Sequence, residues 1–241
     1  MTTVTFKALS ALLSYPTAEL QQAAPELTAA LDGEALISAS IRRQLDLLLN
    51  EIAGGDLYDL QERYVLLFDR TRSLSLHLFE HVHGESRDRG QAMIDLKNLY
   101  ESKGLELEAA ELPDYVPLFL EFLSTQPRAE AYELLGQPAH ILSALAERLR
   151  KRHSAYEAVF RSLVALAAAK PKGEDISALL AQPDPDANDL EALDAAWEDE
   201  PVNFGPNASN CKDTLIEKIR AGRRPAPGVT QPGNRPVMPR H

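Results

Sequence analysis

The sequence lacks several features that secreted proteins and membrane proteins share. Cys211 is the single cysteine, so no disulfide can form within the chain, and a reducing compartment fits this composition. No apolar run approaches the ~20 residues that are needed to span a bilayer, and we expect no direct membrane insertion. Residues 1–16, MTTVTFKALSALLSYP, contain no signal-peptide cleavage site and are typical of a first helix.

Motifs of nucleophilic and nucleotide chemistry are also missing. The chain has no glycine-rich phosphate loop and no G-x-S-x-G turn, and Cys211 lies in a Gly/Pro/Asn-rich stretch without an evident base. Positive charge is in short supply as well, because 36 acidic residues outnumber 25 basic ones and give a net charge of −11. Nucleic-acid binders carry clustered Lys and Arg, so we expect no nucleic-acid partner. A basic peptide would suit this charge better.

Helical periodicity is what the sequence does contain, almost everywhere up to Lys170. Asp56 is placed to cap a helix whose apolar face carries Leu57, Leu60, Tyr64, Leu67 and Phe68. The helix before it should stop at Gly54-Gly55 through a left-handed glycine, and Ser154 with Glu157 should form a capping box. No stretch shows the alternation of a strand. The sequence therefore predicts an all-α fold in a single helical domain.

Composition divides the chain into three parts. Residues 1–170 form the predicted helical domain. Residues 171–205 form an acidic segment with short helices, in which 174–200 contain no Lys or Arg. Residues 206–241 form a Pro/Gly-rich basic tail that we expect to be irregular and disordered. The tail would either remain solvated or cover a binding surface until a binding partner displaces it.

One short pattern points toward an enzyme. His77, Glu80 and His81 match H-x-x-E-H, the spacing by which an inverted zincin presents two imidazoles and a carboxylate to zinc, and His83 follows closely. Alternatively, the two histidines of the pattern are partly buried and hydrogen-bonded beside apolar neighbours. A zinc-dependent hydrolase that uses His77, Glu80 and His81 is the second functional hypothesis.

Two predicted helices carry apolar faces beside acidic residues. Tyr64, Leu67 and Phe68 precede Asp69, and Asp114 with Tyr115 begins a later helix that is equally apolar. Core packing explains such faces. A groove between the two helices, apolar at its floor and acidic at its rim, would instead hold a basic amphipathic peptide. The sequence leaves both interpretations open.

Three blocks of sequence resemble a known family. They are LLSYP at 12–16, LQERYVLLFDRTRSLSLHLFEHVHGESRDRGQAM at 60–93 and LPDYVPLFLEFL at 112–123. These blocks are similar to the NarJ-type assembly chaperones of respiratory nitrate reductase, which belong to the redox-enzyme maturation proteins. The similarity covers about residues 4–170, and WEDEPVNFG at 197–205 is in keeping with it.

The resemblance implies a cytoplasmic, system-specific chaperone and not an enzyme. Such a chaperone binds the N-terminal segment of the catalytic (alpha) subunit. It keeps the apo-enzyme competent for insertion of the molybdenum cofactor and iron-sulfur cluster and for membrane assembly, and it is not part of the final enzyme. The resemblance implies that this chain binds no cofactor or metal itself and deals with the molybdenum cofactor delivery machinery only indirectly, through its client.

The resemblance also suggests where a client peptide binds. Arginines of the client would lie against acidic side chains, and its apolar residues would lie near Phe68 and Tyr64. Many members of the wider family carry a histidine after the aspartate where this chain has Tyr115, which implies the loss of an imidazole there. The predicted peptide-binding set comprises Tyr64, Leu67, Phe68, Asp69, Glu80, His81, Pro113, Asp114 and Tyr115.

Overall fold

The structure is a computed structural model that describes residues 3–82, 87–107, 111–182 and 184. Within these ranges the regular structure is entirely helical, which confirms the all-α prediction. The elements are α1 (Val4–Leu12), α2 (Ala18–Glu34), α3 (Ala39–Gly54), α4 (Leu57–Phe68), a 3-10 turn η1 (Arg72–Leu74), α5 (Leu78–Val82), α6 (Arg87–Ser102), α7 (Val116–Thr125), α8 (Arg128–Gly136), α9 (Ala139–Lys151), α10 (Glu157–Leu166) and α11 (Gly173–Leu180).

The turn between α3 and α4 shows how local chemistry sets the helix ends. The Asp56 side chain accepts hydrogen bonds from the backbone N–H groups of Tyr58 and Asp59, so the predicted N-cap is confirmed. The left-handed glycine predicted before it is wrong, because Gly55 is extended, with φ −76°. A Cβ at Gly55 would lie 2.6 Å from the Glu51 carbonyl oxygen, so close approach requires the glycine there.

The predicted capping box before α10 is also corrected. Helix α10 begins only at Glu157, and Tyr156 is its N-cap residue. The Ser154 hydroxyl accepts from the backbone of Tyr156 at 3.4 Å and does not cap the helix. The residues after Ser154 first form a tight turn, in which the backbone N–H groups of Glu157 and Ala158 donate to the carbonyls three residues before them.

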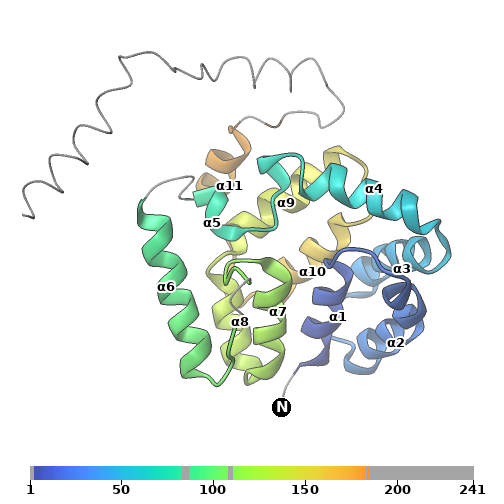
Figure 1. The fold of residues 1–241 in the computed structure, drawn as a ribbon, viewed down its shortest axis with the longest axis horizontal. Coiled ribbons are helices and arrows are strands. Elements are labelled where there is room, and N and C mark those ends of the chain that lie inside the picture. Colours follow the sequence, from blue (N-terminus) through green and yellow to red (C-terminus); the bar gives the residue numbers. More distant parts are fainter. Residues whose placement is uncertain (1–2, 83–86, 108–110, 183, 185–241) are drawn as a thin grey trace, which may run out of the picture. The chain divides into compact units, whose positions relative to one another are not determined.

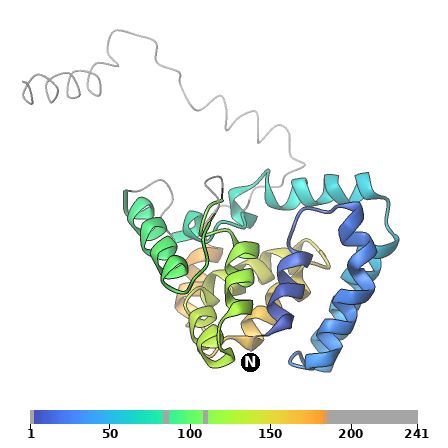
Figure 2. The same ribbon diagram turned by 60° about the horizontal axis from the view of Figure 1, so that its bottom comes forward.

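The core forms where three helix pairs meet. Helices α9 and α10 pack against each other in the interior, α1 packs on α7, and α2 packs on α3 (Figures 1 and 2). Each pair presents an apolar stripe inward, and burying one such large side chain stabilises the fold by about 1.5–3 kcal/mol. Core side chains that are 1% exposed or less include Phe6, Leu9, Phe122, Leu142, Leu145, Phe160 and Leu163.

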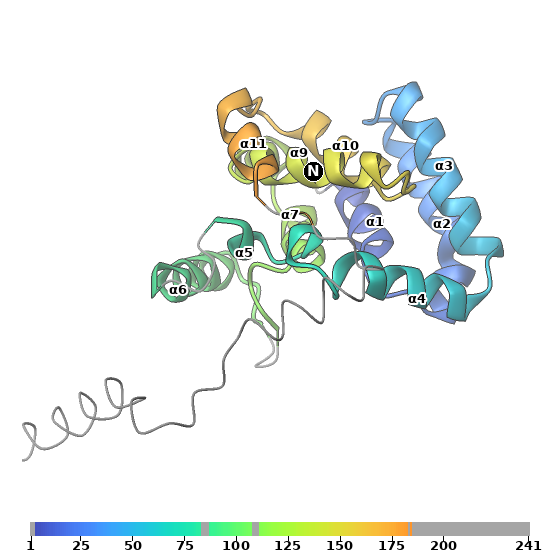
Figure 3. The ribbon, with the colours of Figure 1, turned by 90° about the horizontal axis from the view of Figure 1, so that it is seen from above.

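Helix α4 and the segment after it position the candidate site. Helix α4 lies across one end of α1, and η1 and α5 continue from it over α9 toward α6 at the edge of the fold (Figures 1 and 3). The α6 helix is the least covered, and Tyr100 is the residue that anchors it: this side chain is fully buried against Phe122. The left-handed Gly104, with φ +84°, follows the end of α6.

Arg148 of α9 is buried and ties two short elements to the core. Its guanidinium donates to the Ser73 carbonyl of η1 and to the Leu179 carbonyl of α11, both at 2.7 Å. Carbonyls at helix C-termini favour a cation, and burial lowers the pKa of this arginine. At the C-cap of α9, Arg152 pairs with Asp184 at 2.7 Å. The beginning of the acidic segment is therefore docked on α9.

The rest of the predicted C-terminal organisation, 185–205 and the tail 206–241 with Cys211, lies outside the described residues. Each helix in the described part is too short or too polar to traverse a bilayer.

Candidate functional site

The three segments that the sequence analysis singled out meet at one junction. The strand-like residues His77 and Tyr115 form an isolated antiparallel bridge. The backbone of Leu78 donates to the Asp114 carbonyl at 3.0 Å, and that of Val116 donates to the Leu76 carbonyl at 2.9 Å. These bonds fix the start of α5 to the start of α7 beside the end of α4. The sequence predicted that Asp114 and Tyr115 begin a helix. Helix α7 begins only at Val116, and Tyr115 belongs to the bridge instead.

Asp114 is the centre of the junction. Its side chain is fully buried, with Oδ1 3.1 Å from His77 Nδ1 and Oδ2 accepting from the backbone N–H of Phe79 at 3.1 Å. The second bond satisfies a backbone donor in the first turn of α5 that has no partner within the helix. Asp114 therefore caps α5 as an N-cap residue would, although it comes from a distant segment. Asp114 therefore holds the junction together from within.

The two histidines beside Asp114 are perturbed in opposite directions. The hydrogen bond that His77 donates to Asp114 raises the pKa of His77, whereas burial lowers the pKa of His81. His81 Nε2 lies 2.8 Å from the Ser75 carbonyl, inside the fold. The His77 ring lies 5.3 Å from the Tyr115 ring, so the imidazole beside Asp114 comes from the residue before α5 and not from position 115.

An aromatic cluster of Tyr64, Phe68 and Tyr156 packs beside the junction. The Tyr64 hydroxyl donates to the Leu13 carbonyl at 2.8 Å and lies 3.2 Å from the Tyr115 hydroxyl, which then supplies the proton of that second bond. Tyr64 and Phe68 both pack against Tyr156, and burial raises the pKa of Tyr64. The cluster links α4 to the loop after α1 and to the start of α10.

The structure thus brings the predicted peptide-binding residues together but sorts them by depth. The buried members present almost no surface to a client in this structure, since Asp114 is fully enclosed and Phe68 is 4% exposed. The buried members are Tyr64, Phe68, His81, Pro113 and Asp114. Those that reach the surface wholly or in part are Leu67, Asp69, Glu80 and Tyr115. Glu80 is paired with Arg89 of α6 at 3.2 Å.

The H-x-x-E-H pattern does not form the zincin arrangement. His77 precedes α5, so the two imidazoles do not share a helical face, and each already has a hydrogen-bond partner in the protein. Over the described ranges, no three His, Cys, Asp or Glu side chains gather in a way that could hold a metal ion. His83 lies outside those ranges. The structure therefore favours the structural interpretation of His77 and His81.

A surface feature that the sequence analysis missed lies on the outer face of α4. Tyr58, Val65 and Leu66 of α4 line a groove of about 470 Å³ with Tyr15 from the loop after α1. Tyr58 is 80% exposed and Tyr15 is 45% exposed. The signal was present, because these apolar residues fall off the stripe that Leu60, Tyr64 and Phe68 occupy. A helix with a surplus apolar face predicts a second contact.

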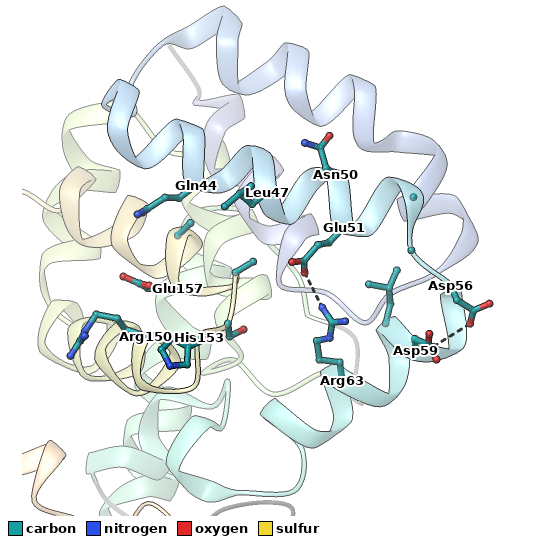
Figure 4. Close-up of a pocket in the computed structure, with 16 residues that line it drawn as sticks. Gln44, Leu47, Asn50, Glu51, Asp56, Asp59, Arg63, Arg150, His153 and Glu157 are labelled. Atoms are coloured by element: carbon teal, nitrogen blue, oxygen red, sulfur yellow. Dashed lines mark hydrogen bonds and ion pairs between the residues drawn. The ribbon is translucent and has the colours of Figure 1, made fainter.

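A larger cleft of about 930 Å³ opens between α3, α4 and the turn from α9 to α10 (Figure 4). Leu47 contributes an exposed apolar side chain to this cleft. An ion pair between Glu51 and Arg63, 2.9 Å apart, crosses it (Figure 4). Arg150, at the opposite wall, is bound by both carboxylate oxygens of Glu147. The charges nearest the opening are thus largely neutralised within the fold.

The described part of the chain is an all-α protein in which an interlocked junction lies beside an aromatic surface groove. A family profile described as the nitrate reductase delta subunit matches residues 15–162. The chain belongs to the nitrate reductase delta subunit family, and the resemblance to NarJ-type assembly chaperones is confirmed.

Curated relatives match most of the chain. The nitrate reductase molybdenum cofactor assembly chaperone NarJ of Escherichia coli K12 is 42% identical over 208 residues, which cover 86% of this chain and 87% of NarJ. The probable assembly chaperone NarW of the same strain is 41% identical over 186 residues, 76% of this chain and 80% of NarW. A solved structure assigned as a redox enzyme maturation protein from Archaeoglobus fulgidus is 21% identical, covers 66% of this chain and 89% of its own, and has a TM-score of 0.46.

Proposed function

We propose that this protein is a system-specific chaperone of nitrate reductase maturation and not an enzyme. It binds the N-terminal segment of the catalytic subunit in the cytoplasm and keeps the apo-enzyme competent for insertion of the molybdenum cofactor and iron-sulfur cluster and for membrane assembly. It leaves before the enzyme is complete, and it deals with the cofactor delivery machinery only through the client.

The observation that carries the proposal is the 42% identity to NarJ over 86% of this chain, since NarJ is named as a nitrate reductase molybdenum cofactor assembly chaperone. The chemistry of the junction supports it. Its carboxylate and its imidazoles are engaged in bonds that hold the fold, which suits a binding protein better than a catalyst.

Binding follows from the charge of this surface. Asp69 is exposed at the end of α4, and Leu67 and Tyr115 are half-buried nearby. Basic side chains of the client lie against Asp69, which speeds encounter and favours the right sequence, while apolar contact gives the affinity. The buried residues Tyr64, Phe68 and Asp114 act as positioning residues that keep these groups in place.

Release requires that the N-terminal segment of the client bind more tightly elsewhere than to the chaperone. When cofactor insertion folds the catalytic subunit, its N-terminal segment binds its own subunit better than it binds the chaperone. No chemical step by the chaperone is required, because the difference in affinity between the two states moves the segment.

The test is titration calorimetry with a synthetic peptide of the N-terminal segment of the catalytic subunit. We expect saturable binding that weakens as salt rises. A scrambled peptide of the same composition is the control. Equal binding of both peptides, or none of either, would refute the proposal. Purification of the mature membrane enzyme should in addition yield no copy of this chain.

A further inference from the structure

The outer face of α4 carries apolar side chains that the fold does not use. The inner stripe of α4 is satisfied, because Leu60, Tyr64 and Phe68 are all buried. Val65 and Leu66 are only half-buried on another side of the helix, and Tyr58 is 80% exposed. Large apolar side chains exposed together on a hollowed surface mark an interaction site.

The groove is formed before any partner arrives. The Gln61 side-chain amide donates to the Pro16 carbonyl at 2.9 Å, which ties the loop after α1 to α4. The Tyr15 ring stands edge-on against Tyr64, with ring centroids 5.5 Å apart. Both contacts hold Tyr15 in position, so little conformational entropy is lost at this residue when a ligand binds. The same Tyr64 ring belongs to the junction, and the groove is thus continuous with it.

The charge around the groove selects the kind of partner. Glu62 lines it, and Asp69, the C-cap residue of α4, is exposed. Arg70 is the lining cation, whereas Arg63 points toward α3 in its pair with Glu51. The groove thus sets one acidic and one basic lining side chain beside an aromatic and aliphatic floor, in a chain whose net charge is −11. A segment that combines apolar residues with Lys or Arg complements this surface.

We propose that the groove formed by Tyr15, Tyr58, Val65 and Leu66 is the subsite for the apolar residues of the client's N-terminal segment, with a basic residue of that segment beside Glu62. The inference rests on the proposed function and assigns the main contact to a surface outside the predicted peptide-binding set. A volume of about 470 Å³ holds a few side chains and not a folded domain.

The experiment measures the affinity of the same synthetic peptide for single variants of the full chain. Tyr58→Ala should weaken binding about tenfold, because an exposed aromatic anchor is lost. Glu62→Gln should weaken it about two- to fivefold at low salt and flatten its salt dependence. Leu47→Ala is the matched control, since it removes another exposed apolar side chain, from the other cleft, and should leave the affinity unchanged.

The outcomes separate this inference from the proposed function. If the wild-type chain fails to bind the peptide, both fall. If the wild type binds and Tyr58→Ala binds equally well, the groove assignment is overturned while the chaperone function stands. If Tyr58→Ala leaves peptide affinity intact but abolishes a dimer in sedimentation, the groove belongs to a second copy of the chain, and the proposal is likewise overturned.

Discussion

The two faces of α4 are similar in composition and opposite in use. The inner face sends Tyr64 and Phe68 into a cluster with Tyr156, where ring contacts of about 5–6 Å leave no room for a ligand. The outer face sends Tyr58 into solvent beside Val65. An aromatic residue near a functional region is therefore no evidence of contact by itself. What distinguishes the two faces is which neighbours the rest of the fold brings to them.

The largest loss of stability is expected from a substitution on the inner face of α4. Phe68→Ala should lower the free energy of unfolding by about 3–5 kcal/mol, because it leaves a cavity among packed rings. Urea unfolding followed by circular dichroism measures it. A loss below about 1 kcal/mol would mean that the Phe68 site is open enough to collapse or to admit water, and the inner face would then be a surface after all.

Asp114→Asn tests the junction with a side chain of the same shape. We expect a loss of about 1–3 kcal/mol, because an amide cannot accept from Phe79 and pair with His77 as a carboxylate does. Asp69→Asn is the matched control, an exposed acid on the neighbouring segment, and it should change stability by less than about 0.5 kcal/mol. Equal effects of the two substitutions would remove Asp114 from its structural role.

The pH dependence of stability reports on His77. Asp114 raises the folded pKa of His77 above its ordinary 6.5, so protonated His77 stabilises the fold. That contribution is fully present below pH 6.5 and is lost as the pH rises through the folded pKa. His81 acts in the opposite sense: its pKa is lowered, so its contribution is present above 6.5 and is lost as the pH falls through its folded pKa.

His77→Gln should therefore cost more stability at about pH 5.5 than at about pH 8.5, by less than about 1 kcal/mol because His77 is partly exposed. Urea unfolding of both proteins at the two pH values gives the difference. A cost that does not change with pH would show that the His77–Asp114 bond does not depend on the proton.

The smallest expected effect on stability belongs to the outer face. Tyr58→Ala should change the free energy of unfolding by less than about 0.5 kcal/mol, since the side chain is 80% exposed. Thermal unfolding beside Phe68→Ala makes the comparison direct. A cost comparable to that of Phe68→Ala would place Tyr58 in the core and would remove the contrast between the two faces.

Much of the fold could be predicted, and the site only in part. The apolar spacing from Leu57 to Phe68 and the cap at Asp56 are local signals, and both predictions were confirmed. The depth of Asp114 could not be predicted. A carboxylate is ordinarily exposed, and only the meeting of two segments 37 residues apart gives this one enough donors to be buried.

The sequence by itself determined that this chain is helical, where α4 begins, and to which family the chain belongs, because capping, periodicity and long similar blocks are all encoded in neighbouring residues. Only the tertiary structure decided which aromatic and acidic side chains are exposed at the surface and which are buried in the core. Burial depends on contacts between α4, α5, α7 and α10, whose residues are far apart along the chain. Those contacts exist only once the helices have packed.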